Sequence, residues 1–143
     1  MLFPLKQLAG LFKALGDATR LRLLNLLSAR SLCVRDLQEV LRISQPLVSR
    51  QLAILRAANL VRTQRQGPRV CYSLSRAPFL NYPLSMFLNE VVPFFPELQA
   101  DVQRLAELRG ERTLESEATS SPPDSAGPAA QPSATTKEKV LIR

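Results

Sequence analysis

The sequence predicts a mainly helical fold that carries one small β-hairpin. Apolar residues recur at helical spacing in several segments before residue 60, which is the pattern of amphipathic helices. Residues 69–75 instead alternate Val70, Tyr72 and Leu74 with their neighbours, as a strand does. With 45% apolar residues among 143, the chain can form one core. No apolar run approaches the roughly 20 residues of a membrane span, so we expect no membrane partner.

The first two elements are expected to be helices. Residues 5–15 repeat leucine and phenylalanine at helical spacing, and Asp17 can cap a second helix over residues 18–29. This second helix is rich in leucine, which predicts a central place in the core. Arg20 and Arg22 lie near its start, where the helix dipole disfavours cations. We therefore expect acidic neighbours or phosphate to hold these two arginines.

A short extended piece and two further helices should follow. Residues 31–34 are too few for a helix, and Asp36 falls in the first turn of a helix that ends near Leu41. Residues 42–44 form a turn. The next helix begins at Ser44, whose hydroxyl can accept a capping hydrogen bond from an orphan backbone N–H.

This last helix has one apolar face and one polar face. The apolar face carries Val48, Leu52 and Leu55. The exposed face carries two amides, a hydroxyl and a guanidinium, on Gln45, Ser49, Arg50 and Gln51. Such groups can form hydrogen bonds with base edges in the major groove. The pair of helices therefore predicts a helix-turn-helix that reads double-stranded DNA.

Two strands follow the reading helix. Residues 60–65 and 69–75 are strand-like, and residues 66–68, Gln-Gly-Pro, form the turn. Arg65 and Arg69 give this hairpin a basic tip, so we interpret it as a wing. An isolated hairpin is marginal in water, so the wing must pack on the helices or on the extended piece.

The region after Asn81 is expected to be helical and to mediate dimerisation. Prolines at 83, 93 and 96 divide it. Its apolar side chains exceed what a small core needs; they are Met86, Phe87, Val91, Phe94, Phe95, Leu98, Val102 and Leu105. We expect a second copy of the chain to bury them, together with the first helix, as two-fold DNA half-sites favour. The alternative is that they close the monomer's own core.

The domain boundary is predicted near Arg112. Residues 113–143 are rich in Ser, Pro and Ala and lack aromatic residues, which predicts a disordered tail. Residues 1–112 then form one winged helix-turn-helix domain that binds DNA and dimerises.

Charge and composition favour DNA binding over catalysis. Residues 1–76 contain 13 Lys/Arg and 3 Asp/Glu, whereas residues 77–143 contain 6 and 9. The basic half thus carries the reading helix, which promotes encounter with DNA. The chain has no histidine, which removes the commonest general base, and it has no Gly-rich phosphate loop. We therefore predict that it is not an enzyme.

The motifs LFKALGDATRLRLLNLL and SLCVRDLQEVLRISQPLVSRQLAILRAANLVRTQRQGPRVCYSL closely resemble the ArsR family of bacterial winged-helix repressors. The resemblance covers residues 5–76. It implies a homodimer that binds an inverted-repeat operator, represses transcription and leaves DNA when an inducer binds. The recognition positions carried over are Ser44, Gln45, Pro46, Val48, Ser49, Arg50 and Gln51. Gln45, Ser49, Arg50 and Gln51 are the expected direct readers, and Val48 is expected to pack or to contact a thymine methyl. On the wing, Arg62, Arg65 and Arg69 are expected to contact phosphates, which position the protein without specifying sequence.

The two cysteines, Cys33 and Cys71, do not by themselves identify the inducer that the protein senses. Without a secretory leader they predict a cytoplasmic protein with free thiols. Cys33 matches the first ligand of metal-sensing members, but Arg35 stands where the second would be and cannot ligate a metal, so the sequence predicts no metal site of that kind. Three interpretations remain: inert buried residues, a redox switch, or a soft metalloid such as arsenite bound with a third donor. Strand alternation predicts that Cys71 points outward, which disfavours pairing.

A sequence-specific repressor is the leading function. A nonspecific architectural DNA-binding protein would use the same basic surface without choosing an operator. Amides and a hydroxyl on the reading face favour the repressor, because a pure phosphate binder needs Lys and Arg. An adaptor that uses the fold without DNA is a further alternative.

Overall fold

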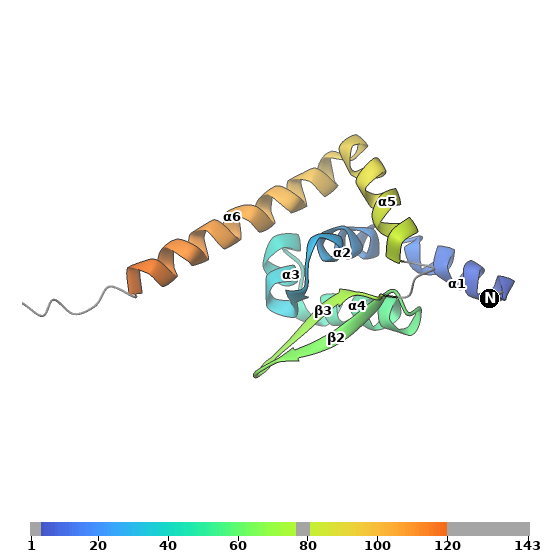
Figure 1. Cartoon of the computed structure of the whole chain (residues 1–143), viewed down its shortest axis with the longest axis horizontal. Helices are drawn as coiled ribbons and strands as arrows, with labels where there is room; N and C mark the ends of the chain where they lie inside the picture. Colours follow the sequence, from blue (N-terminus) through green and yellow to red (C-terminus); the bar gives the residue numbers. More distant parts are fainter. Residues whose placement is uncertain (1–3, 77–80, 120–143) are drawn as a thin grey trace, which may run out of the picture.

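The computed structural model describes residues 4–76 and 81–119 (Figure 1). The elements in chain order are α1 (Leu5–Leu15), α2 (Ala18–Ala29), β1 (Leu32–Cys33), α3 (Val34–Leu41), α4 (Gln45–Ala57), β2 (Val61–Gln66), β3 (Arg69–Leu74), α5 (Asn81–Val91), the 3-10 helix η1 (Val92–Phe94) and α6 (Pro96–Thr119). A small sheet lies against helices α2, α3 and α4, and its hairpin projects beyond them (Figure 1). The mainly helical class with one hairpin is confirmed.

The helix boundaries follow local sequence signals. Asp17 caps α2 as expected, because its Oδ1 accepts from the Arg20 backbone N–H at 3.0 Å. Arg42 adopts the left-handed conformation, φ 55°, that ends α3 and turns the chain toward α4. Ser44 occupies the N-cap position of α4, but its hydroxyl makes no capping bond. That part of the prediction is wrong, and Pro46 in the first turn removes one N–H that would have needed a partner.

The three strands form an antiparallel sheet in the order β1-β3-β2. The wing therefore packs against the extended piece, with Leu32 opposite Tyr72 and Cys33 opposite Cys71. Gly67 has φ 61° at the hairpin turn, a conformation that glycine adopts without steric cost.

The predicted inward face of β3 is partly wrong. Cys71 is 1% exposed and Leu74 is 9% exposed, whereas Val70 is 40% exposed. Val70 lies near the hairpin tip, which projects beyond the helices (Figure 1). Cys71 lies opposite Cys33 on the central strand, where neighbouring elements cover it. Which face is covered thus depends on where the hairpin docks, and strict alternation does not report that.

The core is built mainly from leucines of α2, α3 and α4, and α6 closes it through one buried carboxylate. Asp101 is fully buried; its two oxygens accept from Arg22 at 2.7 and 2.8 Å, and Oδ1 also accepts from Arg104 at 2.6 Å. The hydrogen bond to Asp101 raises the pKa of Arg22 above its ordinary value, so Arg22 stays charged. The acidic neighbour expected for Arg22 is confirmed, and it fixes α6 on α2.

Helix α6 continues past the predicted boundary at Arg112 to Thr119. Residues 113–119, TLESEAT, contain neither Pro nor Gly, so nothing in them ends the helix. Arg112 itself anchors the helix through ion pairs with Asp36 and Glu39 of α3. The remaining residues of the predicted tail, 120–143, lie outside the described residues.

Some of the apolar side chains predicted to form the dimer surface after Asn81 are buried, and others are exposed. Leu98 and Leu105 are buried in the chain's own structure. Five others are 44–80% exposed, namely Met86, Phe87, Phe94, Phe95 and Val102. Phe12 of α1 is also 66% exposed, and α1 lies at the same end of the molecule as α5 (Figure 1). Across residues 4–76 and 81–119, no helix has the length and apolar content needed to cross a bilayer.

Candidate nucleic-acid interface

Helix α4, the predicted reading helix, packs against the core through its apolar face. Val48, Leu52 and Leu55 are 0% exposed, so the helix cannot rotate without uncovering them. Gln45, Pro46 and Arg50 are exposed on the other side, with Ser44 just before them. The buried apolar side chains thus fix the orientation of α4, so that the polar residues of its first two turns face solvent. A helix that reads the major groove needs this orientation.

Two of the predicted reading residues contact each other. The Gln45 Nε2 donates to Ser49 Oγ at 3.1 Å, one helical turn further on. Gln45 is exposed and Ser49 is half-buried. The bond limits the rotamers of both side chains in the free protein, and such preorganisation lowers the entropy cost of binding a ligand.

Gln51 is held from inside the protein. Its Oε1 accepts from Arg20 Nη1 at 2.9 Å, and it is half-buried. Arg20 Nε also donates to the Ala14 carbonyl at 2.6 Å, and Nη2 donates to the Lys13 carbonyl at 3.3 Å. One guanidinium therefore joins the end of α1 to the middle of α4. Arg20 was expected to meet acid or phosphate, and it instead binds these carbonyl oxygens.

The wing arginines differ in their surroundings. Arg65 and Arg69 are exposed at the tip of the hairpin, where they can reach phosphates. Arg62 is half-buried, and its Nε donates to Ser73 Oγ at 3.0 Å across the β2–β3 ladder. Its side chain is therefore committed to the hairpin itself.

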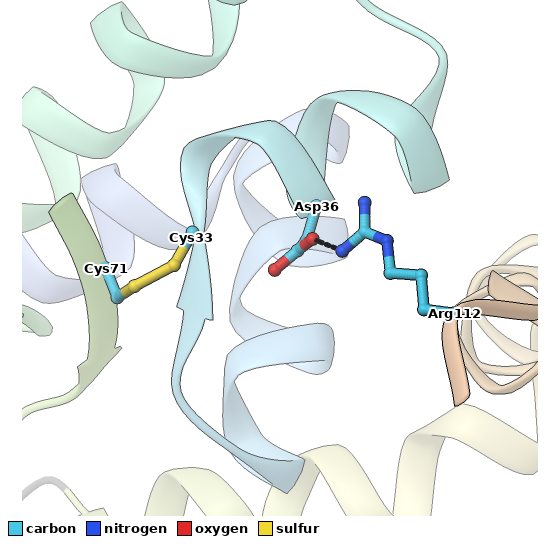
Figure 2. Close-up of a disulfide and its surroundings, with 4 residues drawn as sticks. All are labelled: Cys33, Asp36, Cys71 and Arg112. Atoms are coloured by element: carbon cyan, nitrogen blue, oxygen red, sulfur yellow. Dashed lines mark hydrogen bonds and ion pairs between the residues drawn. A yellow bond between two sulfur atoms is a disulfide. The ribbon is translucent and has the colours of Figure 1, made fainter. Parts of the chain in front are cut away.

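The two cysteines form a disulfide between β1 and β3 (Figure 2). The expectation of free thiols is wrong, and so is the outward orientation of Cys71. Cys33 and Cys71 are separated by 38 residues but face each other in the strand register. The bond joins the residue just before α3 to β3, the central strand of the sheet, so it cross-links the helix-turn-helix to the wing.

An ion-pair cluster lies close to the disulfide. Arg112 of α6 pairs with Asp36 and, at 3.1 Å, with Glu39, while Arg35 pairs with Glu39 at 3.0 Å (Figure 2 shows the Arg112–Asp36 pair). The hydrogen bond to Asp36 raises the pKa of Arg112. Sequence reasoning missed this cluster, because no local pattern relates residue 112 to residue 36; only the Arg35–Glu39 spacing of four was visible.

The described residues assemble no group of three or more His, Cys, Asp or Glu side chains suited to a metal ion. Arg35, two positions after Cys33, is exposed and engaged with Glu39.

Known proteins share this architecture. The family model described as bacterial regulatory protein, arsR family, matches residues 17–63. The arsenic resistance transcriptional regulator ArsR1 of Pseudomonas putida is 43% identical over 104 residues, which cover 71% of this chain and 78% of the relative. The transcriptional repressor SmtB homolog of Synechocystis is 43% identical over 76 residues, which cover 53% of this chain and 58% of the relative.

Among solved structures, the homodimeric winged helix-turn-helix DNA-binding domain from Mycobacterium bovis is similar with a TM-score of 0.55 and 26% identity. That match covers 61% of this chain and 79% of the other. The family model, the sequence relatives and the solved structure indicate the same family. The chain belongs to the ArsR family of bacterial regulatory proteins, which are winged helix-turn-helix transcriptional regulators.

Proposed function

We propose that this protein is a homodimeric transcriptional repressor that binds an inverted-repeat operator through α4 and releases it in response to a thiol signal at Cys33 and Cys71. The observation that carries DNA binding is the exposed polar start of α4, mounted on a fully buried apolar stripe beside a basic wing. Ser44, Gln45, Pro46, Ser49 and Arg50 are the groups offered to base edges and nearby phosphates. Arg65 and Arg69 hold the DNA backbone.

The cross-link between wing and helix-turn-helix supports thiol control. A transcriptional regulator works beside bacterial DNA, in the cytoplasm, where disulfides are rare and are usually transient or redox-sensing. The dithiol is then the resting, operator-bound form. Forming the Cys33–Cys71 bond ties β3 to the residue before α3, which restricts how the wing moves relative to α4 as both meet DNA. Oxidation thereby releases the operator.

The test compares operator affinity of the dithiol and disulfide forms of the full chain, with scrambled duplex as competitor. We expect the disulfide form to bind the operator at least about tenfold more weakly, a difference of about 1.4 kcal/mol. The Cys33→Ser variant should bind like the dithiol form and ignore oxidant. Equal affinity of the two redox forms contradicts thiol control, and equal affinity for scrambled duplex supports the architectural alternative.

Arsenite is the second candidate signal. Cys33 and Cys71 face each other across β1 and β3, and the dithiol they form on reduction presents soft ligands to a soft metalloid. Arsenite should then release the operator from the dithiol form but not from Cys33→Ser, with no disulfide formed. Release by oxidant alone assigns the signal to redox chemistry.

A further inference from the structure

A basic cleft lies beside the disulfide. It has a volume of about 570 Å³ between β1, β3 and α6, and both cysteines line it. Three arginines and one carboxylate also line it: Arg69, Arg109, Arg112 and Asp36. A second cleft of about 810 Å³ shares Cys33, Asp36, Arg69 and Arg112 with the first, and adds Arg35 and Glu115. These volumes are in the range of small-molecule sites.

The two sulfurs differ in accessibility. Cys33 is half-buried and lines both clefts, whereas Cys71 is 1% exposed. A molecule entering either cleft therefore meets the Cys33 side of the bond. The wall also contains Ser31, whose buried Oγ has no hydrogen-bond partner among the described residues. A polar ligand can satisfy such a group, and an apolar one cannot.

The charges favour an anion. Arg112 is already paired with Asp36 and Glu39, so the lining carboxylate is neutralised within the cluster. Arg69 and Arg109 are exposed and line the same cleft. Guanidinium groups bind carboxylates with paired hydrogen bonds, and a cleft with a net positive charge concentrates anionic ligands.

We propose that this cleft binds a small anionic thiol, which carries a carboxylate together with its sulfhydryl, and that this thiol reduces the disulfide. The proposal rests on the thiol control proposed above. The thiolate attacks Cys33, forms a mixed disulfide there and releases Cys71 as a thiolate. A second thiolate attacks the small-molecule sulfur of the mixed disulfide and leaves as the small disulfide, which frees Cys33. Two electrons pass from two thiols to the protein bond, and the protein thiolates take protons from water.

The experiment measures the reduction rate of the oxidised full chain by mercaptoacetate, 2-mercaptoethanol and cysteamine, whose second functional groups are anionic, neutral and cationic. Each rate is divided by the same thiol's rate on a small neutral disulfide, because thiol pKa alters intrinsic reactivity. We expect mercaptoacetate to exceed 2-mercaptoethanol by about tenfold after this correction, cysteamine to be slowest, and the advantage to fall with added salt.

Variants locate the effect. Arg69→Gln and Arg109→Gln should each lower the corrected mercaptoacetate rate by a larger factor than the corrected 2-mercaptoethanol rate, because the mercaptoacetate thiolate carries one more negative charge. Arg56→Gln, an exposed arginine on the last turn of α4 that does not line the clefts, should keep the advantage. Equal corrected rates for the anionic and neutral thiols overturn the proposal, as does a chain that oxidant fails to close into the disulfide. Operator affinity is measured separately, so a charge preference without a redox effect on DNA binding contradicts only the proposed function.

Discussion

Arg50 and Gln51 are adjacent on α4 and have different surroundings. Arg50 is exposed, whereas Gln51 is half-buried with its carbonyl oxygen bonded to Arg20. A bidentate contact from Gln to adenine uses both the amide oxygen and the amide nitrogen, and here Arg20 competes for the oxygen. Among the predicted reading residues, Arg50 is therefore the better candidate for direct base contact.

Replacing Arg50 with Ala should weaken operator binding by about 10- to 100-fold, because a bidentate Arg contact contributes about 1–3 kcal/mol of discrimination. Binding to scrambled duplex should fall much less. Titrations of the two duplexes at one salt concentration check this, with Arg56→Ala as the matched control on the same helix. A uniform loss on both duplexes means that Arg50 contacts phosphate.

At the scale of the elements, Arg20 links the end of α1 to the middle of α4. It donates to two α1 carbonyls and to Gln51, and its backbone N–H satisfies the α2 cap. Helix α1 also carries Phe12 in the expected dimer surface. The guanidinium therefore relates the position of α1, the helix expected to dimerise, to that of α4, the helix proposed to read DNA.

Replacing Arg20 with Gln should weaken operator binding about tenfold, since hydrogen bonds from a charged donor contribute roughly 1.5–3 kcal/mol. Adding Gln51→Ala to that variant should cost little more, because the two residues act through one contact. A double-mutant cycle on operator affinity measures this, with Arg30→Gln as control and melting temperatures in parallel. Additive losses contradict the coupling.

At the scale of the whole molecule, the apolar side chains divide between the chain's own core and an exposed apolar surface. The leucines of α2, α3 and α4 fill the chain's own core. Phe12, Phe87 and Phe94 remain 51–80% exposed on α1, α5 and η1. Apolar surface of this extent commonly marks a protein interface, and a two-fold partner would place two reading helices on one operator.

Replacing Phe12 or Phe94 with Asp should raise the dimer dissociation constant at least about tenfold, since each buried Phe contributes about 1.5–3 kcal/mol. Sedimentation equilibrium without DNA measures this. Val70→Asp, on the exposed wing, should leave the dimer intact. A dimer that tolerates Asp at both phenylalanines would mean that another surface joins the copies.

The sequence by itself determined the helices, the turn between α3 and α4, the hairpin and the exposed polar face of α4, because each depends on periodicity or on a capping residue nearby in the chain. The end of α6 could also have been predicted, since residues 113–119 contain no helix breaker. The run rich in Ser and Pro, which predicted the disordered tail, begins only after these residues.

Only the tertiary structure decided the partners of Cys71, Gln51 and Asp36. Each meets a residue far away in the sequence: Cys33, Arg20 and Arg112. Their pairing depends on how the wing docks on β1 and how α6 crosses α3. Local spacing encodes which face of an element is apolar, but the packing of elements against each other selects which side chains meet.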